Sequence, residues 1–257
     1  MKKLFALSKN TFKETIRDKI LMLIIFFAVL FLFSSHFAAE ISARENDKIT
    51  LDFGLAMINI FGILITIFVG SSLIYKEVEY RTIFTLLSKP IHRSCLVLSK
   101  FFGLAAVLLL VTILMSLIFF YLVPFSGKLF LAIAMMFLSF LLLLSVVIFF
   151  SSFMSPLLSI FSSLIIFIIG NITDDLRMFA KFHVQVGETS EVSSTFKYIA
   201  DAIYFGMPNF EILNLKNKIA YDFVFTLSDG FLAIAMAFLF IIILNFFAVL
   251  IFSRKEF

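Results

Sequence analysis

Residues 129–173 read LFLAIAMMFLSFLLLLSVVIFFSSFMSPLLSIFSSLIIFIIGNIT and contain no Asp, Glu, Lys or Arg. About 20 apolar residues in a helix cross the hydrocarbon core of a bilayer, so one helix over the whole stretch would overshoot it. Pro156 follows a serine-rich run and marks a break, because proline interrupts a helix. The stretch therefore predicts two membrane spans, Leu129–Phe153 and Pro156–Thr173, with a two-residue turn between them.

The rest of the chain holds four more charge-free stretches of spanning length, Ile20–Ala39, Phe53–Tyr75, Phe101–Val123 and Phe231–Phe252. Hydrophobic residues make up 62% of the chain and charged residues 15%, whereas soluble domains are near one half and one quarter. We predict an all-α integral membrane protein with six transmembrane helices, forming a single transmembrane domain over residues 1–257. The first 19 residues mix both charge signs and are not followed by a cleavage site, so they do not form a signal peptide.

The charges outside the spans predict the orientation. The N-terminal segment, residues 76–100 and the C-terminal tail carry 13 basic and 5 acidic residues, while the alternate segments carry 8 and 12. By the positive-inside rule, both termini are expected in the cytoplasm.

The predicted spans hold no carboxylate, and no histidine except His36, near the outer end of the first. Proton-coupled transporters and intramembrane proteases need such groups, and the chain has no phosphate-binding loop and no zinc-protease or nucleophile-elbow motif. We therefore predict no catalytic residues and no metal ligands. Any energy for transport must come from another chain. The basic residues are dispersed, so nucleic acid is not an expected partner.

Residues 1–19 predict an amphipathic helix at the inner leaflet. Basic residues fill much of the segment between apolar residues at helical spacing, and those apolar residues are Leu4, Phe5, Phe12, Ile16 and Ile20. Two interpretations stay open: an anchor on membrane lipids, or a collar that also touches a partner.

Residues 76–100 read KEVEYRTIFTLLSKPIHRSCLVLSK. A short apolar face precedes Lys89-Pro90, and proline disfavours helix in the residue before it. The pattern predicts a short cytoplasmic helix held crosswise between two spans, which would act as a rigid lever. The alternative is a basic connector that faces lipid.

This segment, the six spans and the amphipathic start together resemble the type-2 ABC transporter permeases, in particular the NosY-like group. The resemblance implies that the segment is a coupling helix that docks on an ATPase subunit. The positions that match the family motif are Glu77, Glu79, Arg81, Thr82, Pro90, Arg93 and Lys100. Many relatives have glycine at the position of Arg81.

The resemblance further implies the permease subunit of an ATP-driven exporter in a prokaryotic cytoplasmic (inner) membrane. Its expected partners are an ABC ATPase, a second permease copy or a related permease, and membrane lipids. No cofactor is expected on this chain, because ATP and Mg would bind the ATPase. The alternative is an accessory or scaffold membrane protein without a transport path. No residue identifies a substrate.

Two patterns of small residues lie inside the predicted spans. Gly62, Thr66 and Gly70 recur at every fourth position, a spacing that lets helices approach closely, either within the chain or at a dimer seam. A stripe of hydroxyls, Ser155, Ser159 and Ser163, is a candidate lining of a translocation path, or forms hydrogen bonds between helices.

Residues 174–230 form the predicted extracytoplasmic segment before the last span. Helical spacing predicts a helix over Ser194–Phe205, ended by Met207-Pro208-Asn209 and preceded by a polar loop, Val186–Ser194. Its carboxylates, Asp201 among them, are expected to be solvated.

Overall fold

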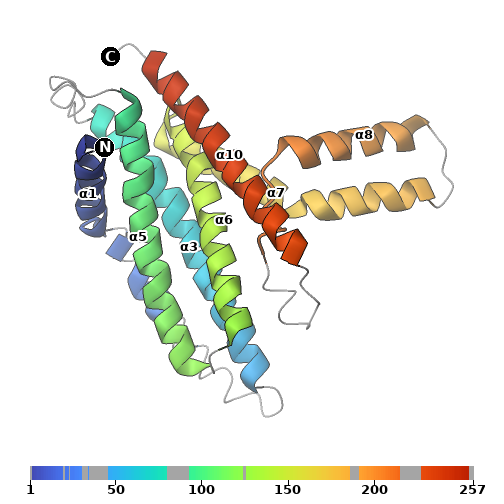
Figure 1. Cartoon of the computed structure of the whole chain (residues 1–257), viewed down its shortest axis with the longest axis horizontal. Coiled ribbons are helices and arrows are strands. Elements are labelled where there is room, and N and C mark those ends of the chain that lie inside the picture. Colours follow the sequence, from blue (N-terminus) through green and yellow to red (C-terminus); the bar gives the residue numbers. More distant parts are fainter. Residues whose placement is uncertain are drawn as a thin grey trace.

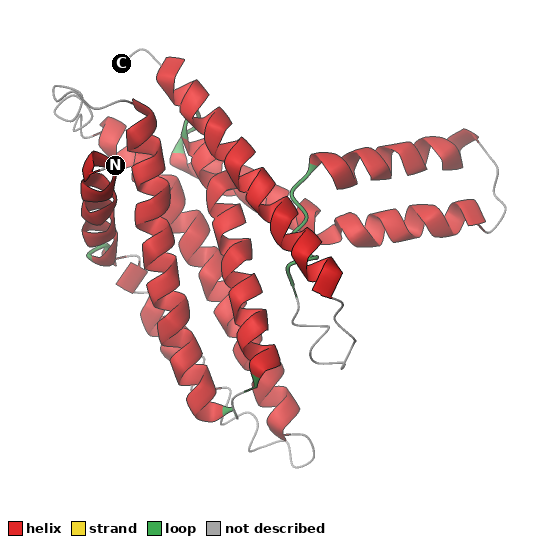
Figure 2. Ribbon diagram, viewed as in Figure 1, coloured by secondary structure: helices red, strands yellow, loops and turns green. Residues whose placement is uncertain are grey.

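The computed structural model describes residues 2–19, 21–22, 24–30, 34, 46–79, 93–123, 126–185, 191–214 and 227–254. Every regular element in these ranges is an α-helix (Figure 2). In chain order the helices are α1 (Lys2–Ile16), α3 (Asn46–Glu79), α5 (Arg93–Leu122), α6 (Gly127–Ser151), α7 (Pro156–Gln185), α8 (Glu191–Gly206) and α10 (Leu227–Arg254).

The long helices form a bundle with a projecting hairpin (Figure 1). Helices α3, α5 and α6 run side by side, α1 lies against α5, and α10 slants across α6. Helix α7 leaves the bundle at a steep angle and pairs with α8 outside it. The start of α1 and the end of α10 lie at the same end of the bundle (Figure 1).

Within the described ranges, five helices are long and apolar enough to cross a membrane. Their apolar parts are Leu51–Leu73, Ser94–Tyr121, Gly127–Ser151, Pro156–Phe179 and Gly230–Arg254. They correspond to the second to sixth predicted spans and confirm a multi-pass, all-helical membrane protein. Half of the predicted first span, Ile20–Ala39, lies outside the described residues, and the described residues within it, 21–22, 24–30 and 34, are helical.

The helices extend past the predicted spans. Helix α3 continues beyond Tyr75 to Glu79, α5 begins at Arg93 rather than Phe101, and α7 runs on to Gln185. Hydropathy marks only the part of a helix that lies in hydrocarbon, whereas lysine, glutamate and arginine favour helix outside it. Both ends of the predicted coupling segment are therefore continuous with membrane helices.

The predicted break between the fourth and fifth spans is confirmed. Helix α6 ends at Ser151 and α7 begins at Pro156. Proline suits the first position of a helix, where its missing N–H leaves no bond unmade. At the end of α6 the Ser152 N–H donates to the Ile148 carbonyl oxygen at 3.1 Å.

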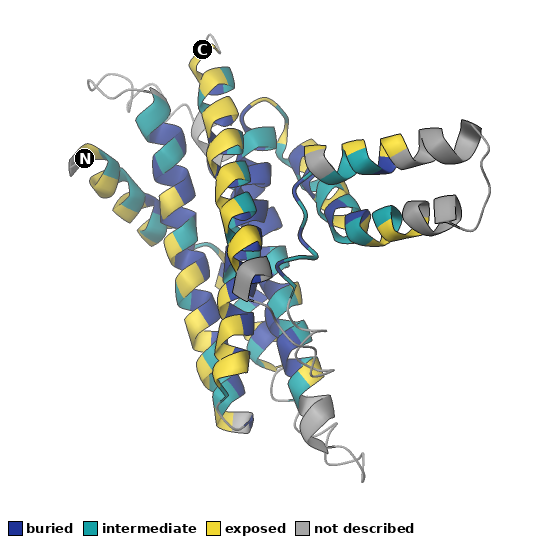
Figure 3. Ribbon diagram, turned by 45° about the vertical axis from the view of Figure 1, so that its right-hand side comes forward, coloured by how far each residue is buried: buried dark blue, intermediate teal, exposed yellow. Residues whose placement is uncertain are grey.

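Helix α6 is the centre of the described bundle. Of its apolar span 78% is buried, against 22% for each of α7 and α10, and Figure 3 shows this contrast. Every residue from Leu142 to Ile148 is buried, because α3, α5, α7 and α10 all contact α6. A helix that is apolar on every side requires such surroundings.

The outward faces of α7 and α10 are apolar and exposed. Phe161 and Ile168 on α7, and Phe238 and Ile242 on α10, are each about half exposed or more. In water this surface would cost roughly 25 cal/mol per Å², whereas lipid chains or another apolar subunit accept it without cost. These faces therefore contact lipid or a second membrane chain.

Glycines on one face of α3 admit large side chains from its neighbours. A Cβ at Gly54 would lie 2.6 Å from the Phe119 ring, and one at Gly62 would overlap the Phe140 ring. Between helices in lipid, where no hydrophobic force brings them together, such close packing is a main source of association.

We expect Gly62→Ala to destabilise the protein by about 1–3 kcal/mol, the usual cost of overpacking. The added methyl would meet Phe140, which is 1% exposed and has no room to withdraw. Thermal unfolding in detergent measures the effect. Gly206→Ala is the matched control, since nothing lies within 4 Å of its new Cβ. Equal melting temperatures for the two variants would contradict this account.

Candidate functional site

The candidate site is the junction of α1 with the start of α5, where the predicted coupling segment returns to the membrane. Helix α1 crosses α5 at Gly103, and a Cβ there would lie 2.6 Å from Thr11 Cβ and 3.0 Å from the Ser8 carbonyl oxygen. Thr11 and Thr15 are both 2% exposed, and the Thr15 hydroxyl donates to the Thr11 carbonyl oxygen at 2.8 Å. Small side chains thus let the two backbones approach closely.

The predicted apolar face of α1 is only partly the face that packs. Phe12 and Ile16 do contact the core, but Phe5 is 72% exposed. Two threonines also pack in this junction: Thr11 lies against Gly103, where its short side chain fits, and Thr15 is buried one turn further along α1. The sequence analysis missed them, since it followed large apolar residues alone.

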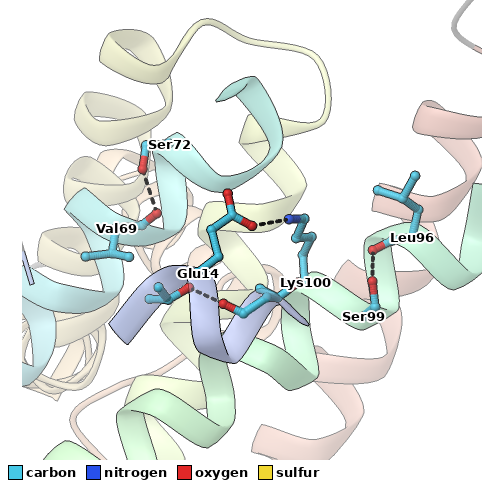
Figure 4. A network of polar contacts seen from close by, with 8 residues as sticks. Glu14, Val69, Ser72, Leu96, Ser99 and Lys100 are labelled. Atoms are coloured by element: carbon cyan, nitrogen blue, oxygen red, sulfur yellow. Dashed lines mark hydrogen bonds and ion pairs between the residues drawn. The ribbon is translucent and has the colours of Figure 1, made fainter. Parts of the chain in front are cut away.

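An ion pair joins the same two helices. Lys100 on α5 is 2% exposed, and its Nζ lies 3.6 Å from Oε2 of Glu14, whose side chain is 48% exposed. Figure 4 shows the two side chains meeting between the ribbons of α1 and α5. A buried ammonium is costly without a partner, so this contact ties α1 to the beginning of α5.

The other predicted coupling residues are less fully placed. Glu77 and Glu79 belong to the last turn of α3, and Arg93 is the first residue of α5, but only their backbone is described. Arg81, Thr82 and Pro90 lie outside the described residues. The two helix ends lie close to the start of α1, at the end of the bundle that also holds the end of α10 (Figure 1).

The predicted packing residues on α3 face other helices of the same chain. Gly62 lies against Phe140 of α6. A Cβ added at Gly70 would lie 3.0–3.6 Å from side-chain atoms of α5 and α6. Thr66 is fully buried and its hydroxyl donates to the Gly62 carbonyl oxygen at 2.7 Å.

The serine stripe lies at the joint of α6 and α7. Ser159 and Ser163 are fully buried, while Ser155 is exposed. The Ser159 hydroxyl is 2.9 Å from the Ser151 hydroxyl and donates to the Val147 carbonyl oxygen at 3.3 Å. Ser159 thus bonds α7 to α6, and the role of the stripe in a path stays a prediction.

A polar contact that the sequence analysis missed joins α10 to α6. The Asn245 amide donates to the Ser145 hydroxyl at 3.0 Å and to the Ile241 carbonyl oxygen at 2.8 Å. Both side chains are buried. Asn245 is the only asparagine in the predicted last span, a signal that could have identified it, since polar side chains in spans tend to pair between helices.

The projecting hairpin is held by polar and aromatic contacts. The Arg177 guanidinium donates to Asp201 at 2.8 Å and stacks on the Tyr204 ring at 4.1 Å from its centroid. Asp201 was expected to be solvated, but it is paired with Arg177.

The predicted helix and its end are confirmed, as α8 ends at Gly206, just before the predicted Met207-Pro208-Asn209 stop. The predicted polar loop is wrong from Glu191 onward, where α8 has already begun; residues 186–190 lie outside the described ranges. Among the described residues, no three His, Cys, Asp or Glu side chains are grouped so that they could hold a metal ion.

We expect Glu14→Gln to lower stability by about 1–3 kcal/mol, because it replaces the carboxylate that faces the buried Lys100 ammonium with a neutral amide. Lys100→Met combined with Glu14→Gln should recover part of this loss. A double-mutant cycle on thermal unfolding in detergent measures the coupling. Asn10→Gln, on the exposed side of the same helix, is the control. A coupling energy near zero would show that the pair does not hold α1.

Asn245→Leu should cost about 0.5–2 kcal/mol, the range measured for hydrogen bonds between membrane helices. Because α10 is little buried, we expect the loss to appear as weaker docking of α10, seen as faster proteolysis before Leu227. Ser116→Ala, which removes a hydroxyl bonded within α5 alone, is the control. If both variants behave alike, the bond to Ser145 does not anchor α10.

A comparison with protein families finds a match over residues 5–257 to the family described as ABC-2 family transporter protein. No curated protein matches the chain. The match spans nearly the whole chain, including α1, the five apolar helices and the hairpin. The chain therefore belongs to the ABC-2 family of transporter proteins, as a membrane subunit.

Proposed function

We propose that this chain is the permease subunit of an ATP-driven ABC exporter of the NosY-like group. It works as a dimer with a second copy or a related permease, and residues 76–100 couple it to a separate ATPase that binds ATP and Mg. Family membership supports the permease role. The motif in residues 76–100 supports the finer assignment, and the charge distribution supports cytoplasmic termini in a prokaryotic inner membrane.

The observation that carries the coupling is the extension of α3 and α5 beyond the predicted spans Phe53–Tyr75 and Phe101–Val123. The motif positions Glu77, Glu79 and Arg93 lie on these extensions. A displacement of the segment between them acts directly on two rigid helices. Both helices contact α6, so the motion reaches the centre of the bundle.

The Glu14–Lys100 contact adds α1 to this moving unit. Because Lys100 lies near the start of α5 and holds α1, a shift of α5 carries α1 with it. We infer that α1 acts as a collar around the coupling end, rather than as a separate lipid anchor.

A second permease subunit could pack against the exposed apolar faces of α7 and α10 of this chain. The Gly62 and Gly70 face of α3 is already covered by helices of the same chain, which disfavours it as the dimer seam. Lining of a path by Ser159 requires α7 to part from α6, because its hydroxyl is bonded to α6, and Ser163 is likewise buried in the bundle.

The test is co-expression of the tagged chain with the ATPase encoded beside it, followed by purification and an ATP hydrolysis assay. We expect Glu77→Ala/Glu79→Ala or Arg93→Ala to lower co-purification, or permease-dependent hydrolysis, by about tenfold, since a charge-assisted contact contributes about 1.5–3 kcal/mol. Lys128→Gln, at the opposite end of the bundle, is the control and should leave both unchanged.

A well-folded wild type that captures no ATPase would instead favour the accessory or scaffold function. Capture that none of the coupling variants weakens would retain the permease but reject this coupling segment.

A further inference from the structure

We propose that the groove between α1 and α5 is a binding site for one anionic phospholipid. The groove has a volume of about 580 Å³, within the range of sites that bury small ligands. None of the residues that line it belongs to the ATPase-coupling set, so lipid binding here would be a property of the chain beyond its proposed coupling to an ATPase.

The floor of the groove is apolar, and part of it belongs to a helix that is long and apolar enough to cross a membrane. Phe102 and Ala106 line it from α5, inside the apolar part Ser94–Tyr121, and Phe5 and Phe12 line it from α1. Phe5 is 72% and Phe102 is 49% exposed. Because this floor faces the bilayer, acyl chains are the material that covers it.

The rim of the groove carries two positive charges. Lys9 and Lys13 line it, lie one turn apart on α1 and are both exposed. The nearest carboxylate on the helix, Glu14, is directed to Lys100. Among the described ion pairs, none engages either lysine. Two ammonium groups above an apolar floor match a phosphate group joined to acyl chains.

The combination selects one occupant. A neutral lipid would fill the floor and leave the paired lysines without a counter-charge, and a soluble anion would meet the lysines and leave the floor empty. Long lysine side chains can keep their stems on apolar surface while their charges reach the headgroup level. An anionic phospholipid satisfies both halves of the groove at once.

The experiment measures lipid binding to the purified full-length chain by native mass spectrometry, with phosphatidylglycerol and phosphatidylcholine as probes. Lys9→Gln/Lys13→Gln should weaken phosphatidylglycerol binding about thirtyfold, about fivefold for each lysine. The control Lys128→Gln/Arg254→Gln removes the same charge elsewhere and should change it little. Ala106→Trp fills the floor from an exposed position and should also weaken binding, with both lysines intact.

Three results would overturn the proposal. Equal binding of both lipids by the wild type would show that the lysines do not select. An equal loss in the control variant would show diffuse attraction of charge rather than a site. Binding that Ala106→Trp leaves unchanged would place the lipid outside the groove. The melting temperature of each variant shows that it has folded.

Discussion

Close packing against α6 is the constraint on which the described structure depends. Lipid chains are as apolar as leucine, so burial from water cannot draw one span to another. The helices are therefore held together by complementary packing of their side chains and by a few hydrogen bonds. Gly62 receives Phe140, Ser159 bonds α7 to α6, and Asn245 bonds α10 to Ser145. Helices α3, α7 and α10 thus each have their own contact with the same central helix, and the bundle is arranged around it.

Much of the fold could be predicted from the sequence, because the bilayer imposes a strong requirement. Every span must be apolar, of a minimum length and helical, so hydropathy located the five spans that the structure describes. The helix ends were less predictable. Charged residues end the hydrocarbon part without ending the helix, so α3 continues to Glu79 and α7 to Gln185.

The candidate site was predictable only in part. Lys100 was found through its motif, but its partner Glu14 lies 86 positions away and carries no local pattern. Thr11 and Thr15 were missed because their importance comes from the glycine they face. Asn245 could be recognised in the sequence as a polar residue within an apolar span, but the sequence did not indicate the helix to which it bonds. Residue type and spacing show which residues share one face of a helix. Which residues of two helices contact each other depends on how the helices are arranged in space.

The short joint between α6 and α7 has a consequence for how the protein enters the membrane. No charged residue occurs between Lys128 and Asp174, so the turn from Ser152 to Ser155 and the helical segments that flank it are uncharged. The turn therefore offers no signal that would hold it on one side during synthesis. Since its polar backbone must still leave the hydrocarbon core, the two helices have to be inserted together, as one hairpin whose orientation is set by the charges at its far ends.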